Sequence, residues 1–346
     1  MPLFSEAQRV ANRIGLRAVA KGEEPNALGG DGLGLDRVED GDGLRRCDGP
    51  ATVDGGTAVL ADPERRAAIH RLHHAIVDHT YGVARDGWAR ALPGLHAAWE
   101  QLVEKYPGRA RAAPRTQPDG SWVADGNRRL NPEQNSEACK ACKDVSDEGK
   151  QVILPAMQRI EAADPDRKLA GLEHMLKGED RLKEKIADEM AAKAWLTLRQ
   201  ALDTVADPVR FTLTYTPDRY AGGVRTDVER LKEEGFELIQ LKNLWASDQY
   251  KGVNSQWCRT ETGLRFEVQF HTPESREAKE LTHKAYERIR SSQASPAERR
   301  ELEDFQRRVN ELVLAPPGVD EVKDFRRGRD DREDHLLRDN RRVYEP

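Results

Sequence analysis

The chain has 346 residues, of which 37% are hydrophobic and 34% are charged, and its formal net charge is −5. This length suffices for two domains or for one large domain with a sizeable core. The acidic balance excludes a surface that attracts nucleic acid over its whole extent, so we expect no stable DNA binding. The 56 Lys and Arg residues are nevertheless enough for a local basic cleft.

The N-terminal segment, residues 1–24, has no continuous apolar run. We therefore expect no signal peptide and no membrane contact, with a cytoplasmic location as the default and export by a leaderless route left open. Segment 1–60 is rich in Gly and Asp beyond residue 20. It is predicted to be flexible, because so little apolar surface cannot offset the entropy lost on ordering.

Residues 61–165 are predicted to be mostly helical, with no role that the sequence reveals. Apolar residues at helical spacing predict helices over 62–105. The segment 107–132, rich in Pro, Gly and Arg, predicts a linker or an irregular loop. A helix over about 133–162 follows, and Pro155 is expected to bend it.

Cys139 and Cys142 form a single CxxC pair. A structural zinc site needs two further ligands, and no second pair is visible in the sequence. Two small apolar residues one turn apart on a helix are the favoured interpretation.

From residue 166 to residue 316, short apolar runs alternate with helical patterns. This alternation predicts an α+β domain with a mixed sheet of about five strands flanked by helices. A charged tail, residues 317–346, is expected to be loosely ordered. The predicted strands are residues 169–178, 209–215, 236–245, 254–260 and 264–270, and the predicted helices are residues 179–205, 218–235, a helix that ends at 290, and 296–314.

Polar side chains gather at the ends of these predicted strands. Lys177 ends the first strand, Asp207 precedes the second, and Glu267 and Gln269 alternate along the last, so both face one side of the sheet. Carboxylates that hold Mg²⁺ and lysines that neutralise phosphates are what phosphoryl-type transfer needs. An ion pair of Glu267 across the sheet is the structural alternative. No Gly-rich phosphate loop occurs, so side chains would have to build the phosphate site.

Five stretches resemble, in order and spacing, the motifs of the synthetase domain of RelA/SpoT-type alarmone enzymes. The most specific are "FEVQFHT", which matches E-x-Q-x-x-T, and the helix motif "ELTHKAYE" that follows it. Looser matches are "MLKGEDRLKEK", "VADPVRFT" and "YKGVNSQW". The resemblance covers about residues 168–290 and implies a synthetase domain with a nucleotidyltransferase-like fold over 166–316.

The resemblance implies transfer of the β,γ-pyrophosphate of ATP to the 3′-hydroxyl of a nucleotide, with Mg²⁺ as cofactor and ATP as co-substrate. The partners would be nucleotides or an RNA 3′ end, and oligomers are common among small enzymes of this family. Where a motif residue is missing, the nearest suitable side chain is taken in its place. On this basis the resemblance implies catalytic roles for Glu267, Asp207 and Gln269, and Mg²⁺ ligation by Asp207 and Glu267. It implies ATP binding by Lys177, Lys185, Arg181 and Arg219, and acceptor binding by Lys251, Asn254, Tyr250 and His283.

Three departures from the family pattern concern base recognition and the metal. Met175 stands where the family has an Arg that stacks on adenine, and Arg219 is the candidate replacement. Asp207 is the carboxylate nearest to the position of the motif Asp. Val253 replaces an acceptor-loop Tyr, and Tyr250 lies three residues upstream. The acceptor base therefore stays open, and two alternatives remain: a toxin-like effector that modifies RNA 3′ ends, and an inactive nucleotide-binding module.

Overall fold

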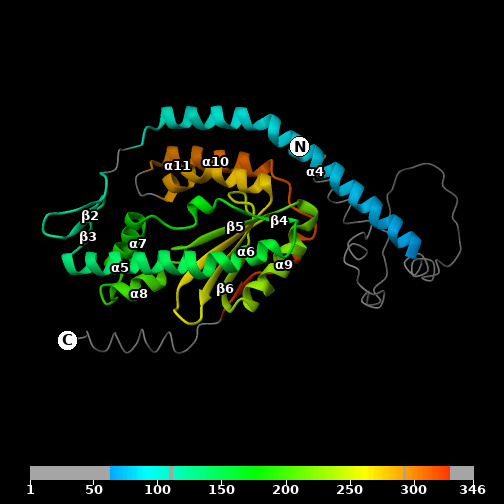
Figure 1. Ribbon diagram of the computed structural model, residues 1–346. Coiled ribbons are helices and arrows are strands. Elements are labelled where there is room, and N and C mark those ends of the chain that lie inside the picture. Colours follow the sequence, from blue (N-terminus) through cyan, green and yellow to red (C-terminus); the bar gives the residue numbers. More distant parts are fainter. Residues whose placement is uncertain (1–62, 109–111, 291–293, 328–346) are drawn as a thin grey trace. The chain divides into compact units, whose positions relative to one another are not determined.

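The computed structural model describes residues 63–108, 112–290 and 294–327 (Figure 1). The chain divides into two units, residues 1–83 and residues 84–346. The predicted flexible segment 1–60 lies outside the described residues, as does the tail from residue 328. Of the first unit, the structure describes the beginning of helix α4, Pro63–Lys105, which confirms the helical pattern predicted there.

The second unit combines helices with a large sheet and a small sheet, which confirms the α+β class. Its helices are α5 (Pro132–Glu148), a π-helical segment (Gly149–Ile153), α6 (Leu154–Ala162), a 3-10 turn (Leu172–His174), α7 (Glu179–Ala192), α8 (Leu198–Thr204), α9 (Pro217–Glu233), α10 (Pro273–Arg290), α11 (Pro296–Glu311) and a 3-10 turn (Val319–Glu321). Its strands are β1 (Arg115–Thr116), β2 (Trp122–Ala124), β3 (Arg128–Leu130), β4 (Arg167–Ala170), β5 (Arg210–Tyr215), β6 (Phe236–Asn243), β7 (Val253–Arg259), β8 (Arg265–His271) and β9 (Phe325–Arg326).

The large sheet has six strands in the order β4-β5-β8-β7-β6-β9. It is mixed, because β5 and β8 run parallel while the other neighbouring strands are antiparallel. Arg210 lies opposite Glu267 in the parallel pair, and Asn254 of β7 lies opposite Gln269. The beginnings of β5 and β8 therefore lie next to each other at the centre of the sheet.

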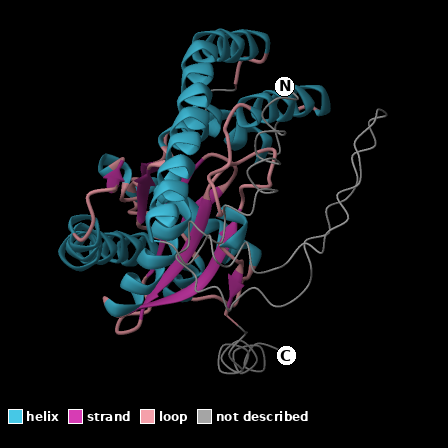
Figure 2. Cartoon of the chain, turned by 90° about the vertical axis from the view of Figure 1, so that its right-hand side faces the viewer, coloured by secondary structure: helices cyan, strands magenta, loops and turns pink. Residues whose placement is uncertain are grey.

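Helices cover both faces of this sheet (Figures 1 and 2), and the two faces differ in the side chains that they carry. Phe211, Val268 and Phe270 face one side and are fully buried, and α9 packs against β5 and β6. On the other face, Glu267 and Gln269 lie beneath α10, which packs against β5 and β8. Strand β8 is thus buried on both faces, and its buried polar groups all need partners.

Several predicted elements differ from the observed ones. The predicted helix 179–205 is two helices, because Thr197 starts a new helix by accepting a hydrogen bond from the Gln200 amide. The predicted loop 107–132 contains the small sheet β1-β2-β3. The π-helical segment lies just before Pro155, where a bend was expected.

The compact unit that begins at Ala84 includes α5 and α6, and their buried residues share one core with the sheet. Beyond residue 316, β9 adds a sixth strand beside β6. Phe325 and Arg326 of the predicted tail are therefore part of the sheet.

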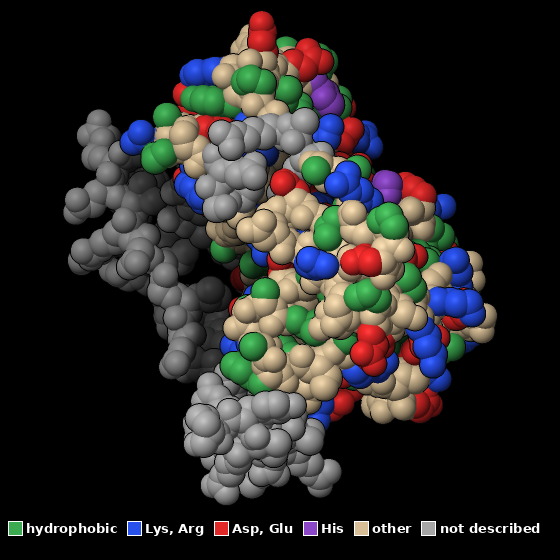
Figure 3. Space-filling view, turned by 90° about the vertical axis from the view of Figure 1, so that its left-hand side faces the viewer, with side chains coloured by type: hydrophobic (Ala, Val, Ile, Leu, Met, Phe, Trp, Pro, Cys, Tyr) green, Lys and Arg blue, Asp and Glu red, His purple; other side chains and the backbone are tan. Residues whose placement is uncertain are grey.

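The described helices include none that is long and apolar enough to cross a membrane. On the face drawn in Figure 3, Lys and Arg side chains are interspersed with Asp and Glu side chains. This face therefore presents mixed charge rather than one large basic patch.

Tyr220 of α9 links the helix to two strands. Its hydroxyl donates to the Phe270 carbonyl at 2.7 Å and accepts from the Val253 amide at 3.0 Å. Tyr220→Phe leaves both buried backbone groups without this partner, so we expect the free energy of unfolding to fall by about 1–3 kcal/mol. Urea denaturation measures it. Tyr286→Phe, at an exposed position, is the control, and an equal loss in both variants contradicts the assignment.

Candidate active site

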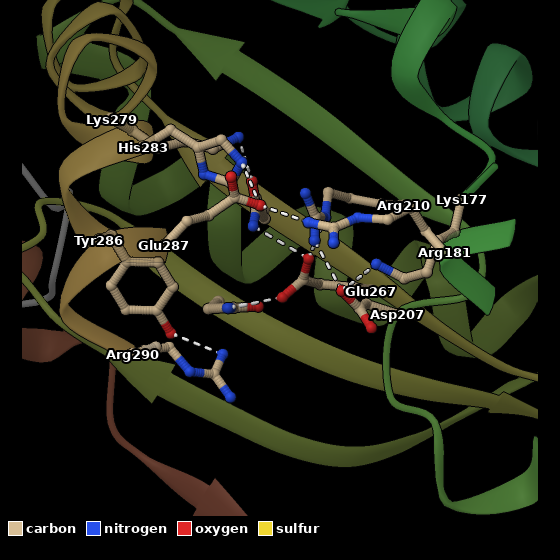
Figure 4. Close-up of polar contacts among 12 residues, drawn as sticks. Lys177, Arg181, Asp207, Arg210, Glu267, Lys279, His283, Tyr286, Glu287 and Arg290 are labelled. Atoms are coloured by element: carbon tan, nitrogen blue, oxygen red, sulfur yellow. Dashed lines mark hydrogen bonds and ion pairs between the residues drawn. The ribbon is translucent and has the colours of Figure 1, made fainter. Parts of the chain in front are cut away.

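Asp207 and Glu267 meet at the adjacent beginnings of β5 and β8 (Figure 4). Arg210 joins them: its Nε donates to Glu267 Oε2 at 2.5 Å, and its Nη2 donates to Asp207 Oδ2 at 2.8 Å. Lys177 Nζ donates to the same Asp207 oxygen at 3.0 Å. The structure therefore brings together the two carboxylates and the first lysine that the sequence predicted.

Glu267 is held on both carboxylate oxygens although its residue is only 8% exposed. Asn254 Nδ2 donates to Oε1 at 2.7 Å, and Gln269 Nε2 donates to Oε2 at 3.0 Å. Two further predicted site residues thus contact Glu267 directly. The ion pair across the sheet, which was the structural alternative, is also present and is made with Arg210.

The charges around Asp207 decide its protonation. Burial favours the neutral acid, but Lys177, Arg210 and Lys185 together hold the pKa of Asp207 below its usual value. Asp207 is therefore an ionised, half-buried carboxylate at neutral pH. Lys185 acts through its charge, since it makes no hydrogen bond or ion pair with the residues that the structure describes.

Helix α7 turns its basic residues in different directions. Lys183 is buried, forms an ion pair with Glu179 at 2.6 Å and lies 3.1 Å from Cys139 Sγ, so it does not belong to the carboxylate cluster. Arg181 forms an ion pair with Glu287 of α10 at 2.8 Å. Arg181 therefore lies at the edge of the site between the two helices (Figure 4).

Helix α10 contributes a second set of groups to the same face. Lys279 Nζ donates to Gln269 Oε1 at 2.7 Å. Burial, and then the positive charge of Arg210, lowers the pKa of Lys279 to about 8. Burial and the neighbouring cations also lower the pKa of His283, against the opposing effect of Glu287.

Sequence reasoning missed Arg210 and Lys279 as site residues. Arg210 begins a predicted strand, and Lys279 lies four residues before His283 on the same helix face. The helical spacing could have placed Lys279 beside the site. The bridging position of Arg210 depends on the pairing of β5 with β8, which the sequence does not specify.

Arg219 is not brought to this cluster. Asp207 precedes β5, whereas Arg219 lies on α9, which follows the other end of that strand. Its guanidinium forms ion pairs with Asp166 at 3.2 Å and with Asp218 at 3.5 Å. The position of Arg219 therefore does not support the prediction that it stacks on the adenine of an ATP bound at the two carboxylates.

The predicted acceptor loop is only partly directed toward the site. The Tyr250 hydroxyl lies 2.9 Å from His271 Nε2, and burial, followed by the charge of Glu267, raises the pKa of Tyr250 well above its usual value. Lys251 Nζ donates to the Trp245 carbonyl at 2.9 Å. Val253 is fully buried in the sheet, so it cannot face a bound base.

The oxygen atoms at the carboxylates are suited to Mg²⁺. Asn254 Oδ1 is buried and has no hydrogen-bond partner among the residues that the structure describes, and Lys177 and Arg210 both contact Oδ2 of Asp207 rather than Oδ1. Mg²⁺ prefers such oxygen ligands and is commonly held by one or two carboxylates together with substrate phosphates. No group of three or more His, Cys, Asp or Glu suited to a metal occurs within the described ranges.

The sequence matches no protein-family model and no curated protein. Solved structures that it resembles include a GTP pyrophosphokinase family protein from Streptococcus pneumoniae, with 14% identity, a TM-score of 0.33 and coverage of 62% of this chain and 97% of that one. Small alarmone synthetase 2 from Bacillus subtilis has 14% identity, a TM-score of 0.35 and coverage of 52% and 91%. Small alarmone synthetase 1 from Bacillus subtilis, bound to its product pppGpp, has 13% identity, a TM-score of 0.36 and coverage of 52% and 93%.

These neighbours are of the class that the sequence motifs resemble. Their TM-scores lie well below the value that marks a shared fold, so the function of this chain has to be inferred from its own site and motifs.

Asp207→Asn removes an ionised carboxylate whose pKa is lowered in the folded state. Such a group stabilises the fold above its unfolded-state pKa of about 3.9, and this contribution is lost as the pH falls through the lower folded-state value. We expect the variant to lose about 1.5–3 kcal/mol of unfolding free energy at pH 7, the range for hydrogen bonds to charged groups. The difference from wild type should shrink toward pH 3. Denaturation curves at several pH values measure it, and a loss independent of pH contradicts the charge assignment.

Proposed function

We propose that this chain is an ATP-dependent pyrophosphotransferase that moves the β,γ-pyrophosphate of ATP to the 3′-hydroxyl of a nucleotide. The observation that carries the proposal is the pair Asp207 and Glu267, joined by Arg210 at the centre of the sheet. The resemblance of the sequence motifs to alarmone synthetases supports the same proposal, because it implies a catalytic role for Glu267, which lies on β8.

The charge of the cluster suits a polyphosphate. Two carboxylates are surrounded by four cations, so the inner cluster is positive by two; the cations are Lys177, Lys185, Arg210 and Lys279. An excess of positive charge in a half-buried site favours an anionic ligand. Lys177 and Lys185 lie on the side of β4 and α7, where the motifs place the phosphates of ATP.

The transfer forms a bond between the acceptor 3′-oxygen and the β-phosphorus of ATP and breaks the bond from that phosphorus to the α,β-bridging oxygen, so AMP leaves. Glu267 would take the proton of the 3′-hydroxyl as the bond forms. Asn254 would hold that carboxylate in place through the hydrogen bond from its Nδ2 to Glu267 Oε1. Bound by Asp207 and Glu267, Mg²⁺ would supply charge neutralisation on the phosphate oxygens.

A second candidate function arises from the same ion pairs. Arg210 already satisfies both carboxylates, so a nucleotide-binding module without catalysis is also consistent with the cluster. Incubation of the protein with Mg²⁺, labelled ATP and a panel of nucleotides and transfer RNA separates the two. Binding of ATP without any 3′-pyrophosphorylated product favours the nucleotide-binding module without catalysis. A label transferred to the 3′ end of the transfer RNA favours the toxin-like effector that modifies RNA 3′ ends.

Glu267→Gln should abolish transfer. The variant keeps the size of the side chain but loses the charge that accepts the proton, and such a loss commonly lowers the rate about 100-fold or more. Rapid-quench measurement of AMP release gives the rate.

Glu229→Gln, which makes the same change at an exposed position on α9, is the control. Circular dichroism checks that both variants are folded. Near-normal turnover by the Glu267 variant would rule out the assigned role.

We expect adenine nucleotides to serve as acceptors at least as well as guanine nucleotides. The residues at the two motif positions for base stacking, Met175 and Val253, are buried and present no ring to a base. Stacking on an aromatic side chain is worth about 1–3 kcal/mol per base, so its absence should limit discrimination between purines to about tenfold or less. Steady-state kinetics with ADP, ATP, GDP and GTP as acceptors test this, and strict use of guanine nucleotides contradicts it.

A further inference from the structure

Lys279 is a half-buried cation on the site face of the sheet that no motif predicted. Its ammonium nitrogen lies 2.7 Å from Gln269 Oε1, and no carboxylate lies within ion-pair distance of it among the residues that the structure describes. Burial and the charge of Arg210 both disfavour its ionised form. Burying such a cation costs free energy. Its hydrogen bond to Gln269 indicates the role that could offset this cost. The charged and titratable groups that face it are Arg210, Glu267, His271, Arg276, Glu280 and His283.

The Gln269 amide lies between two partners that fix its orientation. An ammonium group can only donate hydrogen bonds, so Gln269 must turn Oε1 toward Lys279. An ionised carboxylate can only accept them, so Gln269 must turn Nε2 toward Glu267 Oε2, at 3.0 Å. Without the ammonium, a half-turn of the amide would place its oxygen against the carboxylate.

We infer that Lys279 is a positioning residue for the proposed transfer: by fixing the amide of Gln269, it holds the Glu267 carboxylate in the orientation that meets the acceptor hydroxyl. This inference rests on the proposed function. Lys279 acts through Gln269 and does not itself contact the reacting atoms. Arg210 and Asn254 hold the carboxylate from other directions, so the loss of Lys279 should misorient it without removing it.

Lys279→Met tests the role by kinetics. Loss of a group that orients a catalytic residue typically lowers activity about 10–100-fold. We expect kcat to fall by this factor, while KM for ATP and for the acceptor stays within about twofold. Lys279→Arg, which keeps the donor and the charge, should retain at least about one third of kcat. Lys284→Met, at an exposed position of the same helix, should leave the rate unchanged. A raised KM with unchanged kcat overturns the inference.

A double-mutant cycle separates this role from direct contact with substrate. If Lys279 acts through Gln269, then Lys279→Met should cost less than about twofold in a Gln269→Ala background. The same 10–100-fold loss in both backgrounds would mean that Lys279 touches a substrate, and it overturns the positioning role.

A third readout needs no activity. In protein labelled with ¹⁵N-glutamine, the side-chain amide signals of Gln269 are assigned by their absence from Gln269→Ala. We expect them to be protected from exchange with water in the wild type and to become exchangeable in Lys279→Met. Unchanged protection overturns the coupling of the two residues. A wild-type protein that transfers to no acceptor overturns the proposed function and the catalytic consequence, whereas the spectra report separately on whether Lys279 fixes Gln269.

Discussion

The burial of one negative charge at the centre of the sheet constrains the rest of this structure. Glu267 lies on a strand that is covered on both faces, where an unpaired carboxylate would cost several kcal/mol on the order-of-magnitude scale for buried ions. Its partners come from three strands: Arg210 from β5, Gln269 from β8 itself and Asn254 from β7. These partners reach it only because β5 runs parallel to β8 in one register and β7 runs antiparallel in another. A slip of one residue in the pairing of β5 or of β7 with β8 would turn Arg210 or Asn254, respectively, to the opposite face.

The same compensation explains how a site with so many charges can be stable. Arg210 and Lys177 pair with the carboxylates, and the positive charge that remains is spread over Lys185 and Lys279. The metal–nucleotide complex of the proposed function would bring both signs of charge and would replace these contacts with equivalent ones. Its binding would exchange ion pairs rather than create them, which would keep the cost of desolvation low.

Much of this arrangement could be predicted from the sequence, because its signals are local. The alternation of Glu267 and Gln269 and the run of short strands predicted a mixed sheet with both side chains on one face. The bridging Arg210 could not be predicted, since it depends on which strands become neighbours. The distance of Arg219 from the site could have been predicted, because a six-residue strand, about 20 Å long, separates Asp207 from the helix that carries Arg219.

Strand alternation also limits how the chain could recognise a base. Asn254 shares a face with Glu267, so Val253, the next residue on the strand, points into the packed core on the opposite side, where Tyr220 lies. A larger side chain at Val253 would disturb that core rather than reach a nucleotide. Tyr250 is an aromatic residue of the predicted acceptor loop, but its hydroxyl is held by His271, which in turn is held by Ser275. These two hydrogen bonds fix the orientation of the tyrosine ring before any base arrives.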